Sequence, residues 1–487
     1  AALPPESDVS WLLAIGRRMN AGEVLYSRDL VEINLPLIMQ MSAIVVGVGD
    51  WLRIDALSLW RVTVGLLVVG GFTVSWRLLR SVLVEIPRET QAALALFFVA
   101  ALVSLPGISF GQREHLVVLG FLPYIVGAGV RAHGRPLPSA TAVLSGLSLA
   151  VGLAIKPHYV LAVPCVELVL GLYRRSWRQA VRVETMTAAA ALLVFVADVV
   201  WRHPGYLEHS LPMALHYYTE YASATFKTTE ACYLLLVLVA AAPGLPRSVA
   251  IFSRLFAVSA VGCYVGYQLQ TGWAYQFLPT AVLSALAFGL PATTVGTAVL
   301  RRLVTRWRAP LWPLCSAVGL TLLVVTVSVM TAARTERIID GRRGYLVTGV
   351  RALVERSWPV GLPKTMAGVT RAMFPSFPVA ELVGAGWGSR FSCLWLLPGI
   401  VAREQGVSSA QPDPARTFLE SAVVEDFARW RPTIVLVERE ELSILEEMLK
   451  ARAFRTVWQS YRLAGSVEHI DVFVRDAPAA SDREAGP

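Results

Sequence analysis

The chain has 487 residues, of which 55% are hydrophobic and 16% charged, and its formal net charge is +9. A soluble domain of this length would carry about a quarter charged residues, and the apolar residues here fall in long blocks, so an ordinary soluble protein is excluded. The tail from Phe374 carries a net charge of −4 and the remainder +13. Because excess arginine in a membrane protein marks cytoplasmic loops, this distribution favours a membrane bundle over a nucleic-acid-binding protein.

Four of the five cysteines, Cys165, Cys232, Cys263 and Cys315, lie inside apolar runs and are expected to pack as small hydrophobic residues. Only Cys393 lies in the polar tail, which excludes an internal disulfide there. No CxxC motif or His/Cys cluster indicates a zinc site.

The first segment, 1–54, is predicted to be a periplasmic loop with juxtamembrane helices. Its apolar stretch Leu35–Val48 is short and is closed by Gly47 and Gly49. If this stretch crossed the membrane, the alternation of loops would place every arginine-rich loop on the outside. We therefore predict that it forms an interfacial helix lying on the outer leaflet. The chain starts at Ala1 rather than at a methionine. With an upstream helix the natural protein would have eleven spans and a cytoplasmic N-terminus.

A transmembrane bundle is predicted over 55–330. Apolar runs of about 16–25 residues are long enough to cross the hydrocarbon core as helices. Ten such runs are present: 55–76, 90–106, 115–130, 138–155, 157–172, 183–201, 229–246, 250–268, 274–298 and 309–330.

The basic residues of the connections set the orientation of this bundle. One set of alternate loops carries 15 arginines: Arg77, Arg80, Arg88, Arg131, Arg135, Arg174, Arg175, Arg178, Arg182, Arg247, Arg254, Arg301, Arg302, Arg306 and Arg308. The other set carries four basic residues: Arg113, Lys156, Arg202 and Lys227. The arginine-rich set is therefore predicted to be cytoplasmic, and the N-terminal segment and the tail after Met330 periplasmic.

The tail is predicted to form a small periplasmic α/β domain over 374–487, joined to the last span by a connector over 331–373. Pro432–Val437 has the pattern of a buried strand, and Glu440–Ala453 has apolar residues at helical spacing. Val467–Arg475 is predicted to be a late strand.

Carboxylates, cations and aromatic residues recur on the predicted outer side at nearly every loop. The main ones are Asp8, Arg28, Asp29, Glu32, Asn34, Gln112, Arg113, Glu114, His115, Lys156, His158, Tyr217, Tyr218, Gln270 and Trp273. Each has a simpler interpretation: Arg113, Glu114 and His115 could cap a helix, and Lys156 could reach the headgroups. The aromatic residues could form an interfacial belt. The recurrence of all three types on one side favours a site.

Transfer of a sugar from a lipid phosphate needs this set of residues. A pair of cations must hold the phosphodiester, and arginine and lysine suit that role. A carboxylate must deprotonate the acceptor hydroxyl for attack at the anomeric carbon. Aromatic side chains can stack on sugar rings, and a groove between helices must admit the polyprenyl tail.

Four short motifs carry a resemblance to a known superfamily. Asp8 sits where an acidic motif is expected in the first periplasmic loop, although Val9 follows it where many relatives carry a second acid. Asn34–Leu37 matches a polar-Pro-Pro-Leu motif that opens a juxtamembrane helix, with leucine in place of one proline. Gly152–Pro157 is similar to an apolar-Lys-Gly/Pro segment whose lysine approaches the donor phosphate, and Gly111–His115 takes the place of another polar motif.

At these residues the chain resembles the GT-C superfamily of polyprenyl-phosphate-sugar glycosyltransferases. The resemblance is closest to the bacterial branch related to protein O-mannosyltransferases and the lipid A aminoarabinose transferase. It implies a polytopic α-helical membrane protein of about 10–11 transmembrane helices with a C-terminal periplasmic α/β domain, in the bacterial inner membrane. The implied reaction is inverting transfer of a sugar from a polyprenyl monophosphate to a periplasmic glycan, lipid or protein.

The resemblance also implies roles for the residues. Asp8 would be the general base, with Asp29 and Glu32 as alternatives, and Arg113, Lys156 and Arg28 would bind the donor phosphate. Glu32 and Glu114 would orient the acceptor or, with Asp8, hold a divalent cation such as Mg or Mn, although no spacing demands a metal. The substrate pocket would be lined by Asn34, Gln112, Glu114, His115, His158, Tyr217, Tyr218, Gln270 and Trp273.

Two other functions are consistent with a polytopic envelope protein. A transporter or lipid flippase should show paired broken helices or charges near mid-membrane. Arg61, Glu167 and Asp198 are the main interior candidates, and no internal repeat is detected. An O-antigen ligase or polymerase would use a pyrophosphate-linked donor and a large outer loop, and the loop 202–228 is modest for that role.

Overall fold

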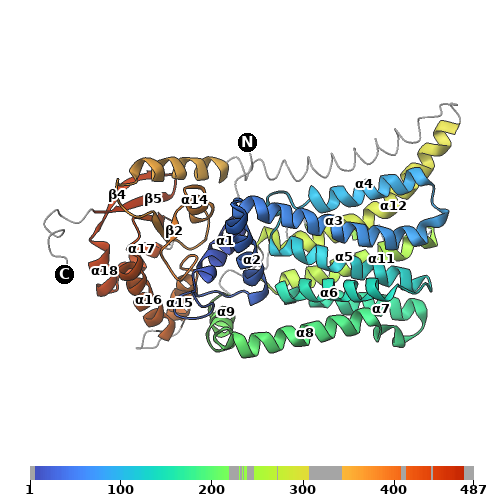
Figure 1. Ribbon diagram of the computed structural model, residues 1–487, viewed down its shortest axis with the longest axis horizontal. Coiled ribbons are helices and arrows are strands. Elements are labelled where there is room, and N and C mark those ends of the chain that lie inside the picture. The colour runs from blue at the N-terminus through green and yellow to red at the C-terminus, as the bar shows by residue number, and fades with distance from the viewer. Residues whose placement is uncertain are drawn as a thin grey trace. The chain divides into compact units, whose positions relative to one another are not determined.

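The computed structural model describes residues 6–218, 230, 233, 235–237, 246–270, 273–305, 343–406, 413–439 and 443–476. The chain divides into two compact units (Figure 1). Unit 1 comprises Ala1–Leu57, Arg202–Tyr221 and Glu336–Pro487, and unit 2 comprises Ser58–Trp201 and Ala222–Thr335.

Unit 2 is a bundle of apolar helices. Its described helices are α3 (Ala56–Val82), α4 (Arg88–Val103), α5 (Arg113–Ala132), α6 (Ser139–Ile155), η3 (Pro157–Leu161), α7 (Ala162–Arg174), α8 (Val183–Arg202), α11 (Arg247–Gln268), η7 (Ala274–Phe277) and α12 (Leu278–Thr305). Among the residues that the structure describes, five helical segments are long and apolar enough to cross a membrane: Ala56–Glu85, Arg113–Ala132, Val183–Arg202, Arg247–Gln268 and Ala274–Val299. The prediction of a polytopic helical membrane protein is confirmed.

Eight of the ten predicted spans coincide with described helices of this bundle. The predicted spans 229–246 and 309–330 lie largely or wholly outside the described residues. The span predicted over 157–172 starts with the 3₁₀ turn η3 instead of an α-helix. Pro157 explains this start, because a proline disfavours helical backbone in the residue before it, here Lys156 with φ −145° and ψ 87°.

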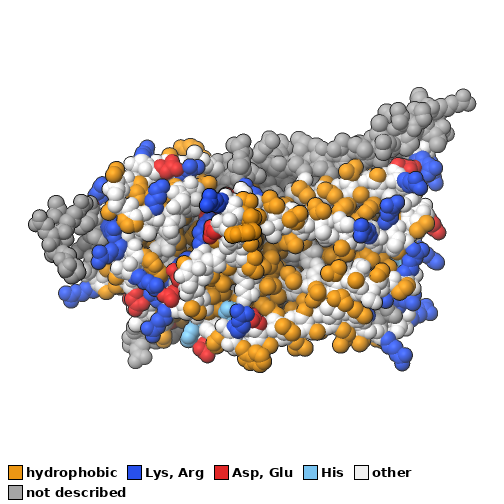
Figure 2. Space-filling view, viewed as in Figure 1, with side chains coloured by type: hydrophobic (Ala, Val, Ile, Leu, Met, Phe, Trp, Pro, Cys, Tyr) orange, Lys and Arg blue, Asp and Glu red, His pale blue; other side chains and the backbone are white. Residues whose placement is uncertain are grey.

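The outward faces of α3 and α8 are apolar. Leu66, Val69, Leu193, Val194 and Trp201 are between 61% and 81% exposed. A protein surrounded by water rarely exposes such a continuous apolar surface, so these faces are lipid-facing. Figure 2 shows hydrophobic side chains over these helices, with Lys and Arg gathered at the end of unit 2 that holds the α3–α4 and α7–α8 connections.

Two glycines allow α11 to pack closely against η3 and α7. A Cβ on Gly262 would lie 2.6 Å from the Cα of Ala162, and one on Gly266 would lie 2.2 Å from the carbonyl oxygen of His158. Small residues four apart allow this approach of backbones between membrane helices. The end of α11 is therefore fixed against the segment that follows Lys156.

Unit 1 contains a five-stranded sheet in the order β2-β1-β3-β5-β4. The strands are β1 (Thr365–Val369), β2 (Gly386–Trp387), β3 (Ile434–Glu438), β4 (Tyr461–Val467) and β5 (Ile470–Arg475). β1 pairs in parallel with β2 and β3, whereas β5 is antiparallel to β3 and β4. The predicted C-terminal α/β domain is thus present.

The sequence elements predicted in this domain correspond to observed ones, with one difference at its start. β3 lies on the predicted buried strand, and α17 (Ile444–Leu449) lies within the segment Glu440–Ala453 that was predicted to be helical. A second helix, α18 (Arg452–Trp458), lies mostly beyond that segment. However, β1 comes from the segment 331–373 that was predicted to be a connector. Its sequence Thr-Met-Ala-Gly-Val contains few bulky apolar residues and gives a weak strand signal, although four of the five residues are buried.

Unit 1 also contains helices from three separate parts of the chain. They are α1 (Ser7–Asn20), α2 (Pro36–Leu52), α9 (Leu211–Tyr217), a helix over 343–357, α14 (Ser376–Leu382), α15 (Leu396–Gly406) and α16 (Pro414–Trp430). The helix predicted over Leu35–Val48 is α2, which packs on α1. Val31 lies in the same apolar core as Val369, Leu396 and Val435. The N-terminal segment therefore folds as part of the unit that contains the C-terminal sheet.

Candidate functional site

A cluster of buried charges lies at one end of unit 2. It is formed where helices break: Arg113 and Glu114 open α5, Lys156 follows α6, and Gln270 follows α11. The Lys156 Nζ atom lies 3.1 Å from Glu114 Oε1 and donates a hydrogen bond of 3.0 Å to Gln270 Oε1. Arg113 and Lys156 both act electrostatically on His158, so both cations lie at this end.

The charges of this cluster are almost fully removed from solvent. Arg113 is 5% exposed, Lys156 6% and Glu114 0%. Burying a charge is costly unless a partner of opposite sign or hydrogen bonds compensate for the lost hydration. Within the described residues, the cluster places two cations beside the Glu114 carboxylate, and cations of this kind suit a phosphate ligand.

Local sequence features fix each cluster residue. Pro157 ends α6 and leaves Lys156 in extended backbone at the break. Gly111 adopts a φ of +86° in the turn before α5, where a Cβ would lie 2.8 Å from the Trp60 indole nitrogen. Gln270 donates from Nε2 to the Gly266 carbonyl at 3.0 Å, which directs its Oε1 atom toward Lys156.

His115 was predicted to bind substrate, but the structure gives it a structural role. It is fully buried, and Nδ1 accepts a 3.2 Å hydrogen bond from the Gly111 backbone nitrogen. The Nε2 atom lies 2.9 Å from the Leu102 carbonyl oxygen and donates to it. Both ring nitrogens are used to hold the turn before α5, so substrate binding by His115 is not supported.

The remaining predicted residues of unit 2 lie around the same helix breaks. Gln112 is the buried residue before α5, and His158 is exposed at η3. Trp273 is 37% exposed at the start of η7, and its backbone nitrogen donates to Gln276 Oε1 at 3.1 Å. Tyr159 donates from its hydroxyl to the Gln276 carbonyl at 2.6 Å, which joins η3 to η7.

One buried acid of unit 2 was missed by the sequence analysis. Glu230 is 2% exposed and accepts hydrogen bonds from Tyr267 at 2.9 Å and from Tyr264 at 3.3 Å. In the sequence, Glu230 stands at the start of the predicted span 229–246, where an acidic residue at the membrane interface is common. Only the two tyrosines, three residues apart on α11, could have indicated a buried partner.

A second charge cluster lies at the opposite end of α5. Arg182 donates to Glu167 at 2.5 and 2.7 Å, and Arg131 donates to Glu184 at 3.1 and 3.3 Å. Tyr124 donates to Glu167. Glu167, the interior charge that a transporter could have used, is therefore paired within a balanced structural cluster.

In unit 1, Asp8 occupies the first turn of α1 and is 5% exposed. Its backbone nitrogen donates to the Glu6 carboxylate at 2.7 Å, which caps the helix. A carboxylate in the first turn is favoured by the positive end of the helix dipole.

Glu32 was predicted as an alternative base, but its oxygens are occupied by protein donors. Oε2 accepts from the Trp11 indole at 2.7 Å, and Oε1 accepts from the backbone nitrogens of Ile33 and Asn34 at 2.8 and 2.9 Å. The Asn34 side-chain amide adds a bond of 2.6 Å. Glu32 therefore joins α1 to the segment that opens α2, and Asn34 serves the same joint.

The other candidate acid and cation of the N-terminal segment lie nearer the surface. Asp29 pairs with Arg429 of α16 and is about one-third exposed, and Arg28 is exposed. The pairing with Arg429 gives Asp29 a structural role.

The predicted aromatic residues of α9 lie against the C-terminal domain. Tyr217 donates to Asp413 at 2.6 Å, and burial with this contact raises the Tyr217 pKa to about 12. Tyr218 packs edge-on against Trp395, with ring centroids 5.7 Å apart. Both residues pack at the edge of the apolar core of unit 1.

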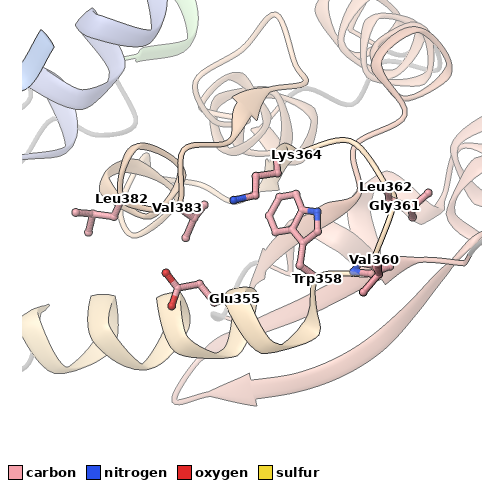
Figure 3. A pocket seen from close by; sticks show the side chains of 9 residues that line it. Glu355, Trp358, Val360, Gly361, Leu362, Lys364, Leu382 and Val383 are labelled. Atoms are coloured by element: carbon pink, nitrogen blue, oxygen red, sulfur yellow. The ribbon is translucent and has the colours of Figure 1, made fainter. Parts of the chain in front are cut away.

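A separate pocket of about 520 Å³ opens in unit 1 between the helix over 343–357 and α14. Figure 3 shows Glu355, Trp358 and Lys364 at this pocket, with the Lys364 side chain next to the Trp358 ring. It contains none of the predicted site residues. Within the described ranges, no group of three His, Cys, Asp or Glu residues is placed to hold a metal ion.

The sequence matches no family model and no curated protein. Among solved structures, it is similar to ArnT from Cupriavidus metallidurans bound to undecaprenyl phosphate, with a TM-score of 0.53 and 15% identity. The apo state of the same protein matches this chain with a TM-score of 0.54 and 15% identity. Each match covers 100% of this chain and 95% of the other. The chain therefore shares the fold of these ArnT structures.

The archaeal oligosaccharyltransferase AglB from Archaeoglobus fulgidus, solved with an inhibitory peptide and a dolichol-phosphate, is also similar. Its TM-score is 0.46 at 10% identity, over 98% of this chain and 72% of that chain. The fold expected from the sequence motifs agrees with the fold of the ArnT structures.

Proposed function

We propose that this chain is an integral-membrane glycosyltransferase that moves a sugar from a polyprenyl-phosphate donor to an acceptor hydroxyl in the periplasm. The observation that carries the proposal is the buried Arg113–Glu114–Lys156 cluster of unit 2. Two cations held out of water at a helix break suit a phosphate, because charge-assisted bonds to phosphate are strong in such surroundings. The GT-C fold and the lipid phosphate bound to ArnT support the same donor class.

In this proposal each residue has a defined part. Arg113 and Lys156 hold the donor phosphate, and Glu114 and Gln270 keep the lysine in place. Asp8 takes the proton of the acceptor hydroxyl, and the oxygen attacks the anomeric carbon from the face opposite the phosphate. The bond from the anomeric carbon to the phosphate oxygen breaks, and the two cations stabilise the charge on the departing polyprenyl phosphate. His158 and Trp273 line the path of the sugar.

The proposal is tested with purified full-length protein in nanodiscs, a panel of radiolabelled polyprenyl-phosphate sugars and a membrane extract as acceptor. Wild type should transfer or slowly hydrolyse one donor. Lys156→Ala and Asp8→Asn should each lower turnover at least about 100-fold, since removing a group that stabilises transition-state charge or moves a proton costs this much.

Two exposed residues provide matched controls. Lys450→Ala and Asp50→Asn change the same residue types away from the proposed site and should leave turnover within about twofold of wild type. If wild type consumes none of the donors, glycosyl transfer is wrong and transport becomes the leading function. If the site variants match their controls, the reaction stands but the residue roles are wrong.

A further inference from the structure

Arg18, near the end of α1, joins the N-terminal segment to the C-terminal α/β domain. It is 8% exposed and donates to the Glu23 carboxylate at 2.6 Å, to the Ser389 carbonyl at 2.5 Å and to the Asp29 carbonyl at 2.7 Å. Its guanidinium lies 5.1 Å from the Trp430 ring centroid. This buried side chain therefore contacts three segments of unit 1: the loop after α1, the segment at Ser389 and the end of α16 at Trp430. The first of these is separated from the other two by most of the chain.

Further contacts along α1 reach the same domain. Arg17 donates to Glu381 at 2.5 and 2.6 Å. Trp11 packs against Phe377 of α14, with centroids 5.3 Å apart. In the loop after α1, the Val31 backbone nitrogen donates to the Arg390 carbonyl at 3.0 Å.

The loop after α1 is also held at Glu32, which fixes the other end of the helix. Its carboxylate bonds to the Trp11 indole, one helical turn after Asp8, and to the backbone that opens α2. Asp8 therefore sits on a helix that is fixed near its start through Trp11 and near its end through Arg18. Such fixing matters for a base, because a displacement of about 1 Å in a reacting group can cost about 100-fold in rate.

We propose that the C-terminal α/β domain holds α1 in its working position, and that Arg18 and Glu32 are positioning residues for Asp8. This inference rests on the proposed role of Asp8 as the general base. The domain thereby contributes to proton transfer through the position of α1. Arg18 is suited to this task because its planar guanidinium presents five N–H donors in a rigid fork, whereas a lysine ammonium presents three on a compact, freely rotating group.

The test is a double-mutant cycle on full-length protein in nanodiscs with Arg18→Ala, Asp8→Asn and the double variant. Arg18→Ala should lower kcat about 10- to 100-fold and leave donor KM and polyprenyl-phosphate binding within about twofold of wild type, because the cation cluster belongs to unit 2. In the Asp8→Asn background, Arg18→Ala should have no further effect. Arg18→Lys should recover less than half of the lost activity.

Arg462→Ala, which changes an exposed arginine of β4, is the matched control and should behave as wild type. Hydrogen–deuterium exchange gives a readout independent of activity, and amides of 7–20 should exchange faster in Arg18→Ala but not in Arg462→Ala. If Arg18 had a purely structural role, Arg18→Ala would lower donor binding as well as kcat. Alternatively, its effect on kcat would add to that of Asp8→Asn in the double variant.

The outcomes separate this inference from the proposed function. If Asp8→Asn abolishes transfer while Arg18→Ala leaves kcat and the exchange of 7–20 unchanged, the positioning role is wrong and the enzyme assignment stands. If wild type is inactive with every donor, or if Asp8→Asn is as active as wild type, the role of Asp8 fails and this inference falls with it.

Discussion

The charged residues of the two units are held in different ways. In unit 2, Lys156 and Arg113 are fixed by breaks in their own helices, at Pro157 and at the Gly111 turn. In unit 1, α1 is fixed by contacts to residues far along the chain, such as the bond from Arg18 to Ser389, 371 residues away. Helix breaks at proline and glycine can be predicted from the sequence, whereas a bond between residues as distant as Arg18 and Ser389 cannot.

Burial separates the two regions as well. The Lys156–Glu114 pair has side chains 8% and 0% exposed, whereas in the Arg17–Glu381 pair of unit 1 they are 44% and 9% exposed. Buried pairs are costly to break because one charge is left without compensation, while exposed pairs contribute little. Loss of an ion pair should therefore lower the free energy of unfolding more at Lys156–Glu114 than at Arg17–Glu381.

The largest expected effect is that of Glu114→Ala. Removing the partner of the buried Lys156 should lower stability by about 3–5 kcal/mol, whereas Glu381→Ala should cost no more than about 1 kcal/mol. Thermal unfolding in the same detergent measures both. Added undecaprenyl phosphate should restore more stability to Glu114→Ala than to wild type, since the anion replaces the carboxylate. Equal losses of stability for Glu114→Ala and Glu381→Ala would contradict the expected difference between a buried and an exposed ion pair.

A smaller effect is expected for Gly266→Val, which tests how the end of α11 is held. A Cβ at this position would meet the His158 carbonyl at 2.2 Å, so α11 must move away from η3. Overpacking of this kind costs about 1–3 kcal/mol, and the shift should weaken the bond from Lys156 to Gln270. Thermal unfolding and polyprenyl-phosphate binding should both decrease. Gly65→Val, where a Cβ meets nothing within 4 Å, is the control.

The smallest effect concerns pH and the C-terminal domain. Arg416 donates to Glu404 at 2.6 and 2.8 Å and holds the pKa of that carboxylate below its ordinary value of 4.5. The pair therefore stabilises the fold fully above pH 4.5, and this stabilisation is lost as the pH falls through the lower folded-state pKa. Because the pair is partly exposed, about 1 kcal/mol or less is involved.

Arg416→Ala checks this prediction. Wild type should be more stable than the variant at pH 7, and the difference should shrink as the pH falls below 4.5, as measured by thermal unfolding. Arg462→Ala, in the same domain, serves as the control because its partner Asp476 is half exposed. A difference that grows with acidity would contradict the assigned direction of the Glu404 shift.

Much of the fold could be predicted from the sequence, because long apolar runs and proline or glycine breaks act locally. Lys156 was found in this way, since Pro157 marks the end of a helix within an apolar stretch. β1 was missed because its small residues give no strong strand pattern, and its burial arises from pairing with β3 and β2. The predicted span 309–330 lies outside the described residues.

The roles of the N-terminal acids could not be ranked from sequence for a related reason. Asp8, Asp29 and Glu32 are all acids in a polar segment, and only their partners distinguish them. Those partners include Arg429, which is 400 residues away from Asp29, and the Trp11 indole, 21 residues from Glu32. His115 stands beside charged residues in the sequence, which is typical of a ligand, and its two bonds to backbone atoms can be seen only in the folded chain.

The long sequence separation between Arg18 and Ser389 also sets an order of events during synthesis. At about 5–20 residues per second, a ribosome needs roughly 20–70 s to add the 371 residues between them. During that time α1 cannot make its bonds to the C-terminal domain. The segment bearing Asp8 therefore reaches its final position only after nearly the whole chain has been made, and truncated chains lack that position altogether.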